Sequence, residues 1–231
     1  MALVRLIRKA LTRPLSRVYH RIVPDRYRAD KYWKNRLDKY GLDLRGVGNC
    51  TLSSEENERQ YREAERVFLD FCRAEAIELK NARVLDIGCG TGFYAEVLRN
   101  QGVRAYTGLD ITDALFDQLR ARYPDFTFMQ GDITRSIPPG PYDLILMIDV
   151  TQHIVDAERF SSAMRNVSRA LAPQGTLVVT AWLTPEFVQR QPHEVARPME
   201  YYRREFPDYS FSEPRPFRDK YVFAVRKGSG G

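Results

Sequence analysis

Cysteine, histidine and long apolar runs are all scarce in this chain of 231 residues. The three cysteines, Cys50, Cys72 and Cys89, are far apart, and none belongs to a CxxC or Cys/His cluster of the kind that holds zinc or forms a disulfide framework. We therefore expect no metal site, reduced thiols and a cytoplasmic location. The longest stretch without charge, residues 170–185, is interrupted by proline and glycine and is shorter than the ~18 apolar residues that a membrane span needs. The sequence thus predicts no transmembrane segment.

Positive charge is concentrated at the N-terminal end of the chain. Residues 1–40 hold twelve Lys and Arg against three Asp, a net charge of +9, so residues 41–231 carry −3 and the whole chain +6. Apolar residues at helical spacing between Leu3 and Ile22 share one face of a helix, and the arginines lie mostly on the other. Such a basic amphipathic helix either packs against the protein's own domain or lies on an anionic membrane surface. Both alternatives remain open at this stage.

From residue 82 onward, strand-like apolar runs alternate with helical or loop segments. This alternation predicts a parallel sheet with right-handed crossovers. Two later runs suit a terminal hairpin. The five alternating runs are residues 84–87, 105–109, 126–129, 144–148 and 176–182, and the two later runs are 209–211 and 221–225.

The region before the sheet reads as helical. A helix is expected over residues 26–40, and a longer one begins at Ser53 or Ser54, where acids in the first turn favour an N-terminus, and continues to about Ala76. We accordingly divide the chain into four parts: a basic amphipathic arm (1–24), a helical cap (25–80), an α/β domain (81–227) and a flexible tail (228–231).

The first strand of the α/β domain runs into a glycine-rich turn, Asp86-Ile-Gly88-Cys-Gly90-Thr-Gly92. Glycines at such a turn let the backbone approach a ligand, and ligands of open parallel sheets bind beyond the carboxyl ends of the strands. The spacing departs from the GxGxxG dinucleotide fingerprint, and no Lys-Ser/Thr follows as a Walker loop requires. Asp110, at the end of the second strand, is where an acid accepts hydrogen bonds from two ribose hydroxyls and would repel a ribose phosphate. The ligand predicted here is a nucleoside with an unphosphorylated ribose.

Four segments in order carry a family resemblance: the glycine motif, Asp110, Asp132-Ile133 after the third strand, and Asp149-Val-Thr-Gln-His153 after the fourth. Together they closely resemble the class I S-adenosylmethionine-dependent methyltransferases. The resemblance covers residues 83–227, including an antiparallel last strand over residues 221–226. It implies a Rossmann-like α/β fold, with a seven-stranded, mostly parallel sheet, an antiparallel last strand, helices on both faces and extra N-terminal helices.

The resemblance also implies S-adenosylmethionine as the cofactor and assigns residues to it. The loop from Gly88 to Gly92 would lie along the methionine part, Asp110 would hold the ribose, and Asp132 with Ile133 would flank the adenine. Asp86 would orient the loop or the amino group of the cofactor. The full cofactor-binding set implied is Asp86, Gly88, Cys89, Gly90, Gly92, Asp110, Ile111, Asp132 and Ile133.

A sulfonium methyl group is activated toward in-line displacement, so the protein needs to align a nucleophile about 3 Å from that carbon and exclude water. If the nucleophile is a hydroxyl, its proton must leave, and an imidazole is a suitable base. His153 is the leading candidate and His193 the second. Asp149 either contacts a ligand or satisfies neighbouring backbone donors. The fourth strand lacks the Asn/Asp-Pro-Pro-Tyr signature of methyltransferases that act on amino groups of nucleic-acid bases.

We therefore expect methyl transfer from S-adenosylmethionine to a hydroxyl of a small molecule, such as a lipid-linked or glycan intermediate. Residues 26–40 and 192–207 are expected to close over the acceptor, and residues 1–22 to contact an anionic membrane surface. Three alternatives stay open: a small amine acceptor, with His153 orienting it; an RNA-associated methyltransferase, which the net negative charge after residue 40 disfavours; and a cofactor-binding scaffold without an acceptor site. The oligomeric state is not determined by the sequence.

Overall fold

The computed structural model describes residues 27–227. The basic arm predicted over residues 1–24 and the tail predicted over 228–231 lie outside the described residues. No helix of the described part is long and apolar enough to cross a membrane.

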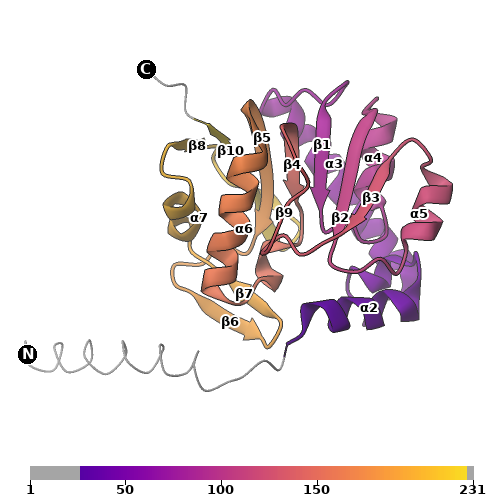
Figure 1. Ribbon diagram of the computed structural model, residues 1–231. Helices are drawn as coiled ribbons and strands as arrows, with labels where there is room; N and C mark the ends of the chain where they lie inside the picture. The colour runs from indigo at the N-terminus through magenta and orange to yellow at the C-terminus, as the bar shows by residue number, and fades with distance from the viewer. Residues whose placement is uncertain (1–26, 228–231) are drawn as a thin grey trace, which may run out of the picture.

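A mostly parallel sheet runs through the middle of the described chain (Figure 1). Its strands follow the order β3-β2-β1-β4-β5-β10-β8, with the short β9 paired to β10 as well. Strands β1 to β5 run parallel to one another, whereas β10 is antiparallel to β5. The strands are β1 (Arg83–Ile87), β2 (Ala105–Asp110), β3 (Thr127–Gln130), β4 (Tyr142–Met147), β5 (Leu171–Ala181), β8 (Tyr209–Phe211), β9 (Arg215–Phe217) and β10 (Lys220–Lys227).

The predicted Rossmann-like architecture is confirmed, with one correction to the strand count. The sheet has eight strands rather than seven, because the Pro-rich connection that we expected between the two hairpin runs contains β9. Residues 215–217 pair with the first residues of β10, and residues 209–211 pair with its last residues. A single long strand thus has room for two short partners on one edge.

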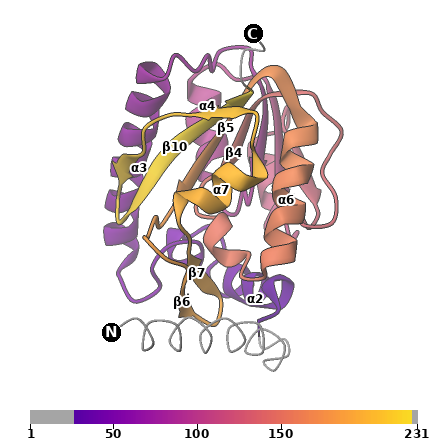
Figure 2. The ribbon, with the colours of Figure 1, turned by 90° about the vertical axis from the view of Figure 1, so that its left-hand side faces the viewer.

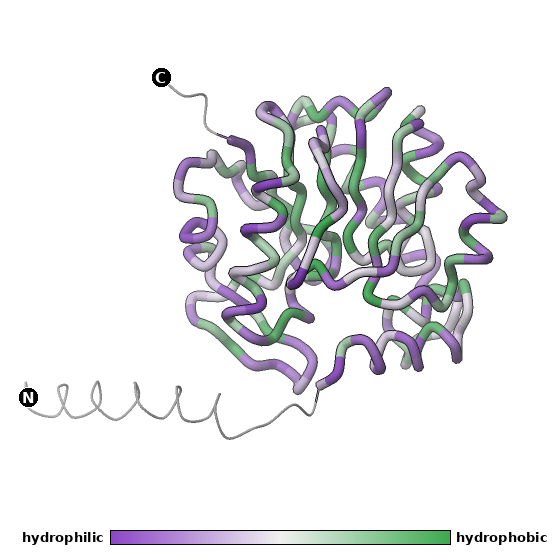
Figure 3. The backbone as a smooth tube through the Cα atoms, in the orientation of Figure 1, coloured by the Kyte–Doolittle hydropathy of each residue, from purple (hydrophilic) through white to green (hydrophobic). Residues whose placement is uncertain are grey.

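Helices cover both faces of the sheet (Figure 2). One face packs against α3 (Ser54–Ala74), α4 (Phe93–Asn100) and α5 (Phe116–Arg122), and the other against α6 (Ala157–Ala170) and α7 (Met199–Glu205). Successive strand residues point to opposite faces, so Val84 enters one core and Leu85 the other. This two-sided burial explains why the strands are almost continuously apolar (Figure 3).

The described N-terminal region forms the two expected helices. Helix α2 (Ala29–Tyr40) leads through the short η1 (Leu44–Gly46) to α3, whose first turn is capped by Ser53 Oγ accepting from the Glu56 amide at 3.1 Å. Both helices agree with the predicted segments to within a few residues. Helix α2 lies below the sheet, beside the small hairpin of β6 (Val188–Gln191) and β7 (Glu194–Ala196) (Figure 1).

The hairpin contacts α2 through Tyr32 Oη and His193 Nε2, which are 3.2 Å apart. The segment after the hairpin was predicted to close over the acceptor, but it packs against the domain instead. Arg197 is buried and donates to the carbonyl oxygens of Thr151 and Ile154, and Tyr202 on α7 is buried with its hydroxyl 2.9 Å from Thr151 Oγ1. Within residues 192–207, only the hairpin part therefore borders the site.

Candidate active site

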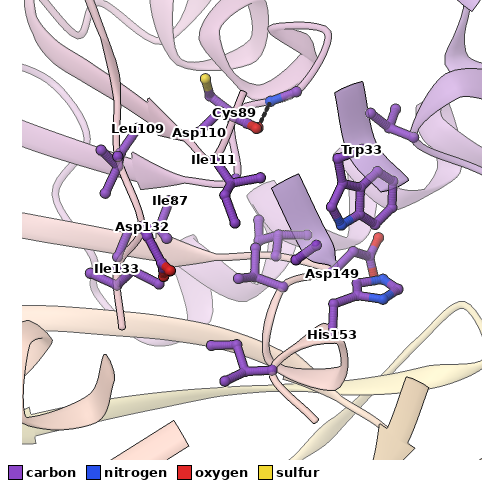
Figure 4. A pocket seen from close by; sticks show the side chains of 18 of the residues that line it. Trp33, Ile87, Cys89, Leu109, Asp110, Ile111, Asp132, Ile133, Asp149 and His153 are labelled. Atoms are coloured by element: carbon purple, nitrogen blue, oxygen red, sulfur yellow. Dashed lines mark hydrogen bonds between the residues drawn. The ribbon is translucent and has the colours of Figure 1, made fainter. Parts of the chain in front are cut away.

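A cavity of about 330 Å³ opens at the carboxyl ends of β1, β2, β3 and β4, where α2 covers them. Residues from the loops after these four strands line it together with α2 (Figure 4). In this view Trp33, Asp149 and His153 lie on one side of the cavity, and Asp132 and Ile133 on the other. The loops meet because the ends of parallel strands lie at one edge of the sheet.

The glycine loop after β1 forms the floor of this cavity. Gly88 and Gly90 have φ values of +75° and +49°, a region that side chains disfavour. A Cβ at Gly88 would lie 2.5 Å from Val150 Cγ2, and one at Gly90 would lie 2.8 Å from Val47 Cγ1. Both positions therefore require glycine. Gly92 caps α4, and Cys89 is buried with its thiol pKa raised by burial.

Asp110 ends β2 and faces the glycine loop with only 8% of its surface exposed. Its two carboxylate oxygens accept from the Gly90 amide at 2.9 Å and the Thr112 amide at 3.1 Å. Burial nevertheless raises the pKa of this carboxyl above its usual value. Each oxygen has a second lone pair, so Asp110 can still accept from two hydroxyl groups.

Asp86 lies beneath the loop instead of in the cavity wall. It is 2% exposed and accepts a hydrogen bond from Tyr106 Oη at 2.7 Å. Burial, with a smaller contribution from the nearby Asp110, raises the pKa of Asp86 to about 7. Of the two roles that the family resemblance implies for Asp86, this position favours support of the loop.

The two residues that the family resemblance assigns to the adenine also lie at the cavity. Ile111 and Ile133 line it, as does Asp132. Oδ1 of Asp132 accepts from both the amide and the hydroxyl of Thr134, while Oδ2 pairs with Arg159 at 2.7 Å. One lone pair of Oδ2 thus remains for a further donor.

Three buried hydroxyl oxygens in the cavity wall have no hydrogen-bond partner among the described residues: Tyr27 Oη, Thr91 Oγ1 and Tyr94 Oη. Buried polar atoms are otherwise almost always hydrogen-bonded, so such atoms indicate a missing ligand. Together with the glycine floor and Asp110, they fit a ligand that has hydroxyl, amino and carboxylate groups, as S-adenosylmethionine does.

His153, in η2 (Thr151–His153), stands at the far side of the same cavity. Its Nδ1 is 2.9 Å from the carbonyl oxygen of His193, which can only accept, so Nδ1 carries the proton and Nε2 has a free lone pair. Trp33 packs edge-on against the imidazole with the ring centres 4.9 Å apart. Burial lowers the pKa of His153 to about 3, with smaller contributions from Lys220 and Arg36. The imidazole is therefore neutral at physiological pH.

Asp149 also lines the cavity, but its carboxylate has two cationic partners. It forms an ion pair with Arg218 and another with Lys220 Nζ at 3.0 Å. Its backbone has φ of +59°, and its amide donates to Thr180 Oγ1 at 2.8 Å. The structure thus gives Asp149 the role of a counter-ion, and its carboxylate is not free to act as a base.

Sequence reasoning missed Arg218 and Lys220, which come from the turn before β10. No local signal marks them, because they reach Asp149 only through the antiparallel pairing of β10 with β5, in which Tyr221 lies opposite Ala181. The second-choice base, His193, instead contributes its backbone carbonyl to His153. The described residues hold no cluster of His, Cys, Asp and Glu that could bind a metal ion.

Residues 84–175 match the methyltransferase domain family. The chain contains a class I methyltransferase domain. The solved magnesium protoporphyrin IX methyltransferase of Synechocystis PCC 6803, with bound S-adenosylmethionine, has the same fold, with a TM-score of 0.65 at 16% identity over 88% of this chain and 100% of that one. Solved methyltransferases of this fold contain bound S-adenosylhomocysteine or S-adenosylmethionine.

Sequence relatives differ in the acceptors that their names give. A trans-aconitate 2-methyltransferase of Methylobacterium nodulans is 32% identical over 50% of this chain and 43% of its own length. A dTDP-4-amino-2,3,4,6-tetradeoxy-D-glucose N,N-dimethyltransferase of Saccharopolyspora spinosa is 29% identical over 48% of this chain and 47% of its own length. The chain spans less than half the length of these two curated relatives.

Proposed function

We propose that this protein transfers a methyl group from S-adenosylmethionine to a hydroxyl oxygen of a small molecule, with His153 as the general base. The observation that carries the proposal is the position of His153 between two cavities. Besides the cofactor cavity, it borders a second cavity of about 1370 Å³, which also contacts Trp33 and Asp149. The second cavity has room for an acceptor, and the buried Gln152 Oε1, which lacks a partner, offers an acceptor site for an O–H or N–H group.

In this proposal the residues around the two cavities have separate roles. The glycine loop and Asp110 hold the cofactor, which supplies an electrophilic methyl group when bound. Nε2 of His153 takes the proton of the acceptor hydroxyl, while Nδ1 keeps its hydrogen bond to the His193 carbonyl and so keeps the ring oriented. Trp33 and the rest of α2 cover the cavity and exclude water.

A small amine is the second candidate acceptor, and the similarity to a named N,N-dimethyltransferase favours it. In that case the neutral imidazole of His153 would orient the amine without needing to remove a proton before attack. The two acceptors differ in pH dependence. An aliphatic ammonium must lose a proton to the solvent before it becomes a nucleophile, whereas a hydroxyl is neutral over the working pH range and gives its proton to the neutral imidazole during attack.

The proposal is tested by cofactor binding and then by transfer. Calorimetry with S-adenosylhomocysteine should show binding to the parent protein and at least about tenfold weaker binding to Asp110→Ala, since two hydrogen bonds to a buried carboxylate are lost. His153→Asn should bind it normally but transfer methyl groups to a hydroxyl acceptor about 10²- to 10⁴-fold more slowly. A parent protein that takes up neither S-adenosylmethionine nor its demethylated product would overturn the proposal.

We also infer that residues 1–22 bring the enzyme to an anionic membrane surface on the cytoplasmic side, where a lipid-linked or glycan intermediate is the acceptor. The support is the amphipathic sequence of this segment, with six Arg and Lys and no acid. The segment precedes Tyr27, the first described residue, which lines the cofactor cavity.

A further inference from the structure

The second cavity is bordered by six Arg and Lys side chains. Two of them, Arg59 and Arg62, lie on α3. The other four come from elsewhere in the chain: Arg36 from α2, Arg190 from β6, Arg218 from the turn before β10, and Lys220 from the start of β10. Residues far apart in the sequence thus place positive charge around one space, on the side of His153 away from the glycine loop.

Two of these cations have no carboxylate partner among residues 27–227. The guanidinium of Arg36 donates only to neutral oxygens, those of Tyr32 Oη and the carbonyls of Arg45 and Gly48, and its buried Nε has no partner. Arg190 packs over the ring of Trp182 at 4.0 Å. Neither arginine is neutralised by the described part of the chain.

The other two cations share their counter-ions. Arg218 and Lys220 both pair with Asp149, and Lys220 also lies 3.4 Å from the largely exposed Asp219. Nε of Arg218 is buried without a partner. Burial, followed by repulsion from Arg218, lowers the pKa of Lys220 to about 8. Lys220 Nζ also lies 4.4 Å from the centre of the Trp182 ring on which Arg190 packs, so like charges gather at this indole.

The remaining acids at the rim of the cavity offset only part of this charge. Glu63 pairs with Arg66 at 2.6 Å, whereas Glu194, 3.7 Å from His193 Nε2, favours the charged form of Lys220. The arginines at the rim on α3, Arg59 and Arg62, pair with glutamates of their own. Arg36 and Arg190 are therefore the cations of this cavity that have no carboxylate partner among the described residues.

We propose that the second cavity binds an acceptor that carries an anionic group, a carboxylate or a phosphate, held by Arg36, Arg190 and the Arg218/Lys220 pair. This inference rests on the proposed function, because it takes the second cavity as the acceptor site. Guanidinium groups with free donors suit such anions, since they form charge-assisted hydrogen bonds with two oxygens at once. The hydroxyl to be methylated would lie toward His153.

An anionic acceptor would also improve His153 as a base. Lys220 and Arg36 are among the groups that disfavour a positive charge on its ring. A bound carboxylate or phosphate would offset these two cations and so raise the pKa of the imidazole toward the working pH. The right substrate would thus help to activate the group that removes its proton.

Binding to the protein saturated with S-adenosylhomocysteine tests the inference without depending on turnover. The carboxylate probes are 4-hydroxybenzoate and its neutral match, 4-hydroxybenzamide, and the phosphate probes are glucose 6-phosphate and glucose. Calorimetry should show that at least one anion binds about tenfold or more tightly than its neutral match, and which anion does so identifies the anionic group. Arg190→Gln and Arg218→Gln should each remove most of this difference.

The control is Arg165→Gln, which changes an exposed arginine on α6 that borders neither cavity. It should leave the binding of all four probes unchanged. Arg190 is exposed, so its substitution decides the matter even if Arg218→Gln fails to fold, which the melting temperature would reveal. Equal binding of anions and neutral matches, with S-adenosylhomocysteine bound, would overturn this inference alone. Failure to bind S-adenosylhomocysteine would instead contradict the proposed function.

Discussion

Three acids near the active site, the buried Asp86 and Asp110 and the partly exposed Asp149, differ in what faces them, and their chemistry differs accordingly. Asp86 faces a tyrosine hydroxyl and no cation, Asp110 faces two backbone amides, and Asp149 faces Arg218 and Lys220. Burial raises the pKa of the first two, whereas Asp149 serves as a counter-ion. Only Asp110 combines a place in the cavity wall with free lone pairs and no cationic partner, which suits it to bind a neutral hydroxylated group.

At the residue scale, the pH dependence of transfer reports on His153. Its pKa of about 3 means that the ring is unprotonated, and able to accept a proton, at every pH above about 5. With an aliphatic hydroxyl acceptor, kcat should therefore be level between pH 5 and 8 and fall only in stronger acid, or at somewhat higher pH with an anionic acceptor bound. With an amine acceptor, kcat/KM should climb by about tenfold per pH unit until the amine is deprotonated.

The measurement is the rate of S-adenosylhomocysteine formation over this pH range for the parent and for His153→Asn. A fall centred near pH 6.5 in the parent, absent from the variant, would show that the imidazole is exposed to solvent and would contradict the packing of His153 against Trp33 and the hairpin.

A second prediction at the residue scale concerns the effect of Asp86 on the pH dependence of stability. Its pKa is about 7 in the folded protein and near 3.9 in the unfolded chain, so the folded state holds a proton that the unfolded state has lost between these values. The contribution of Asp86 to stability is present at low pH and is lost as pH rises toward 7. Asp86→Asn keeps an oxygen that can accept from Tyr106 Oη but has no such pH dependence.

Urea denaturation at pH 5 and pH 8 measures this effect. The free energy of unfolding of the parent should fall relative to that of Asp86→Asn by a few kcal/mol between the two pH values. If both proteins change equally, Asp86 is ionised in the folded state at pH 5 and the cause given for its raised pKa is wrong.

At the scale of elements, the ends of β4, β5 and β10 create the contact between Asp149 and its cations. Asp149 follows β4 and is held by Thr180 of β5, while Lys220 opens β10 beside them. The glycine loop after β1 packs against the connection between α2 and α3 through Gly90 and Val47. The helical cap is thus part of the cofactor site, and its position affects the loop directly.

Gly90→Ala tests this contact. The new Cβ would lie 2.8 Å from Val47 Cγ1 in a backbone with φ of +49°, so we expect S-adenosylhomocysteine to bind at least about tenfold more weakly and the protein to lose about 1–3 kcal/mol of stability. Adding Val47→Ala should restore part of both losses, because it removes the collision but leaves the backbone strain. Calorimetry and thermal unfolding measure the two effects.

Gly102→Ala is the matched control. Gly102 has φ of +85°, but a Cβ there would meet only Lys80 Cγ at 3.5 Å, and the residue lies outside the cavity. This variant should lose stability from strain and keep its affinity for S-adenosylhomocysteine. If Val47→Ala restores nothing in Gly90→Ala, the cap does not press on the loop as described.

At the scale of the whole molecule, charge is divided between the arm and the rest. Residues 1–22 carry six Arg and Lys without an acid, which equals the net charge of +6 of the chain. The rest of the chain is therefore neutral overall, and its cations matter where they gather locally, around the second cavity. Binding to large anionic surfaces should depend on the arm alone.

Co-sedimentation with vesicles measures this dependence. The full chain should bind vesicles that contain phosphatidylglycerol, in a manner that weakens with salt, and should not bind pure phosphatidylcholine vesicles. Deletion of residues 1–22 should abolish binding while the melting temperature stays unchanged. Equal binding by the deleted protein would contradict the membrane role, and salt-sensitive binding of RNA by the full chain in preference to anionic vesicles would favour the RNA alternative.

The sequence by itself determined the sheet and the cofactor side of the site. Gly88, Gly90, Asp110 and Ile133 each lie at the carboxyl end of a strand or in the loop just after it. The ends of parallel strands meet at one edge, so their order along the chain already places them together. The same reasoning placed His153 beside the cavity, and the continuous apolar runs predicted strands buried on both faces.

Tertiary structure alone decided the acceptor side. Lys220 reaches Asp149 through the antiparallel register of β10, and the His193 carbonyl and Trp33 reach His153 through the packing of the hairpin and α2. These contacts join residues that are 40 to 120 positions apart in the sequence. Their meeting does not follow from a shared position at the ends of parallel strands. The charge around the second cavity and the protonation state of His153 depend on burial and on distances between such residues, which no local pattern encodes.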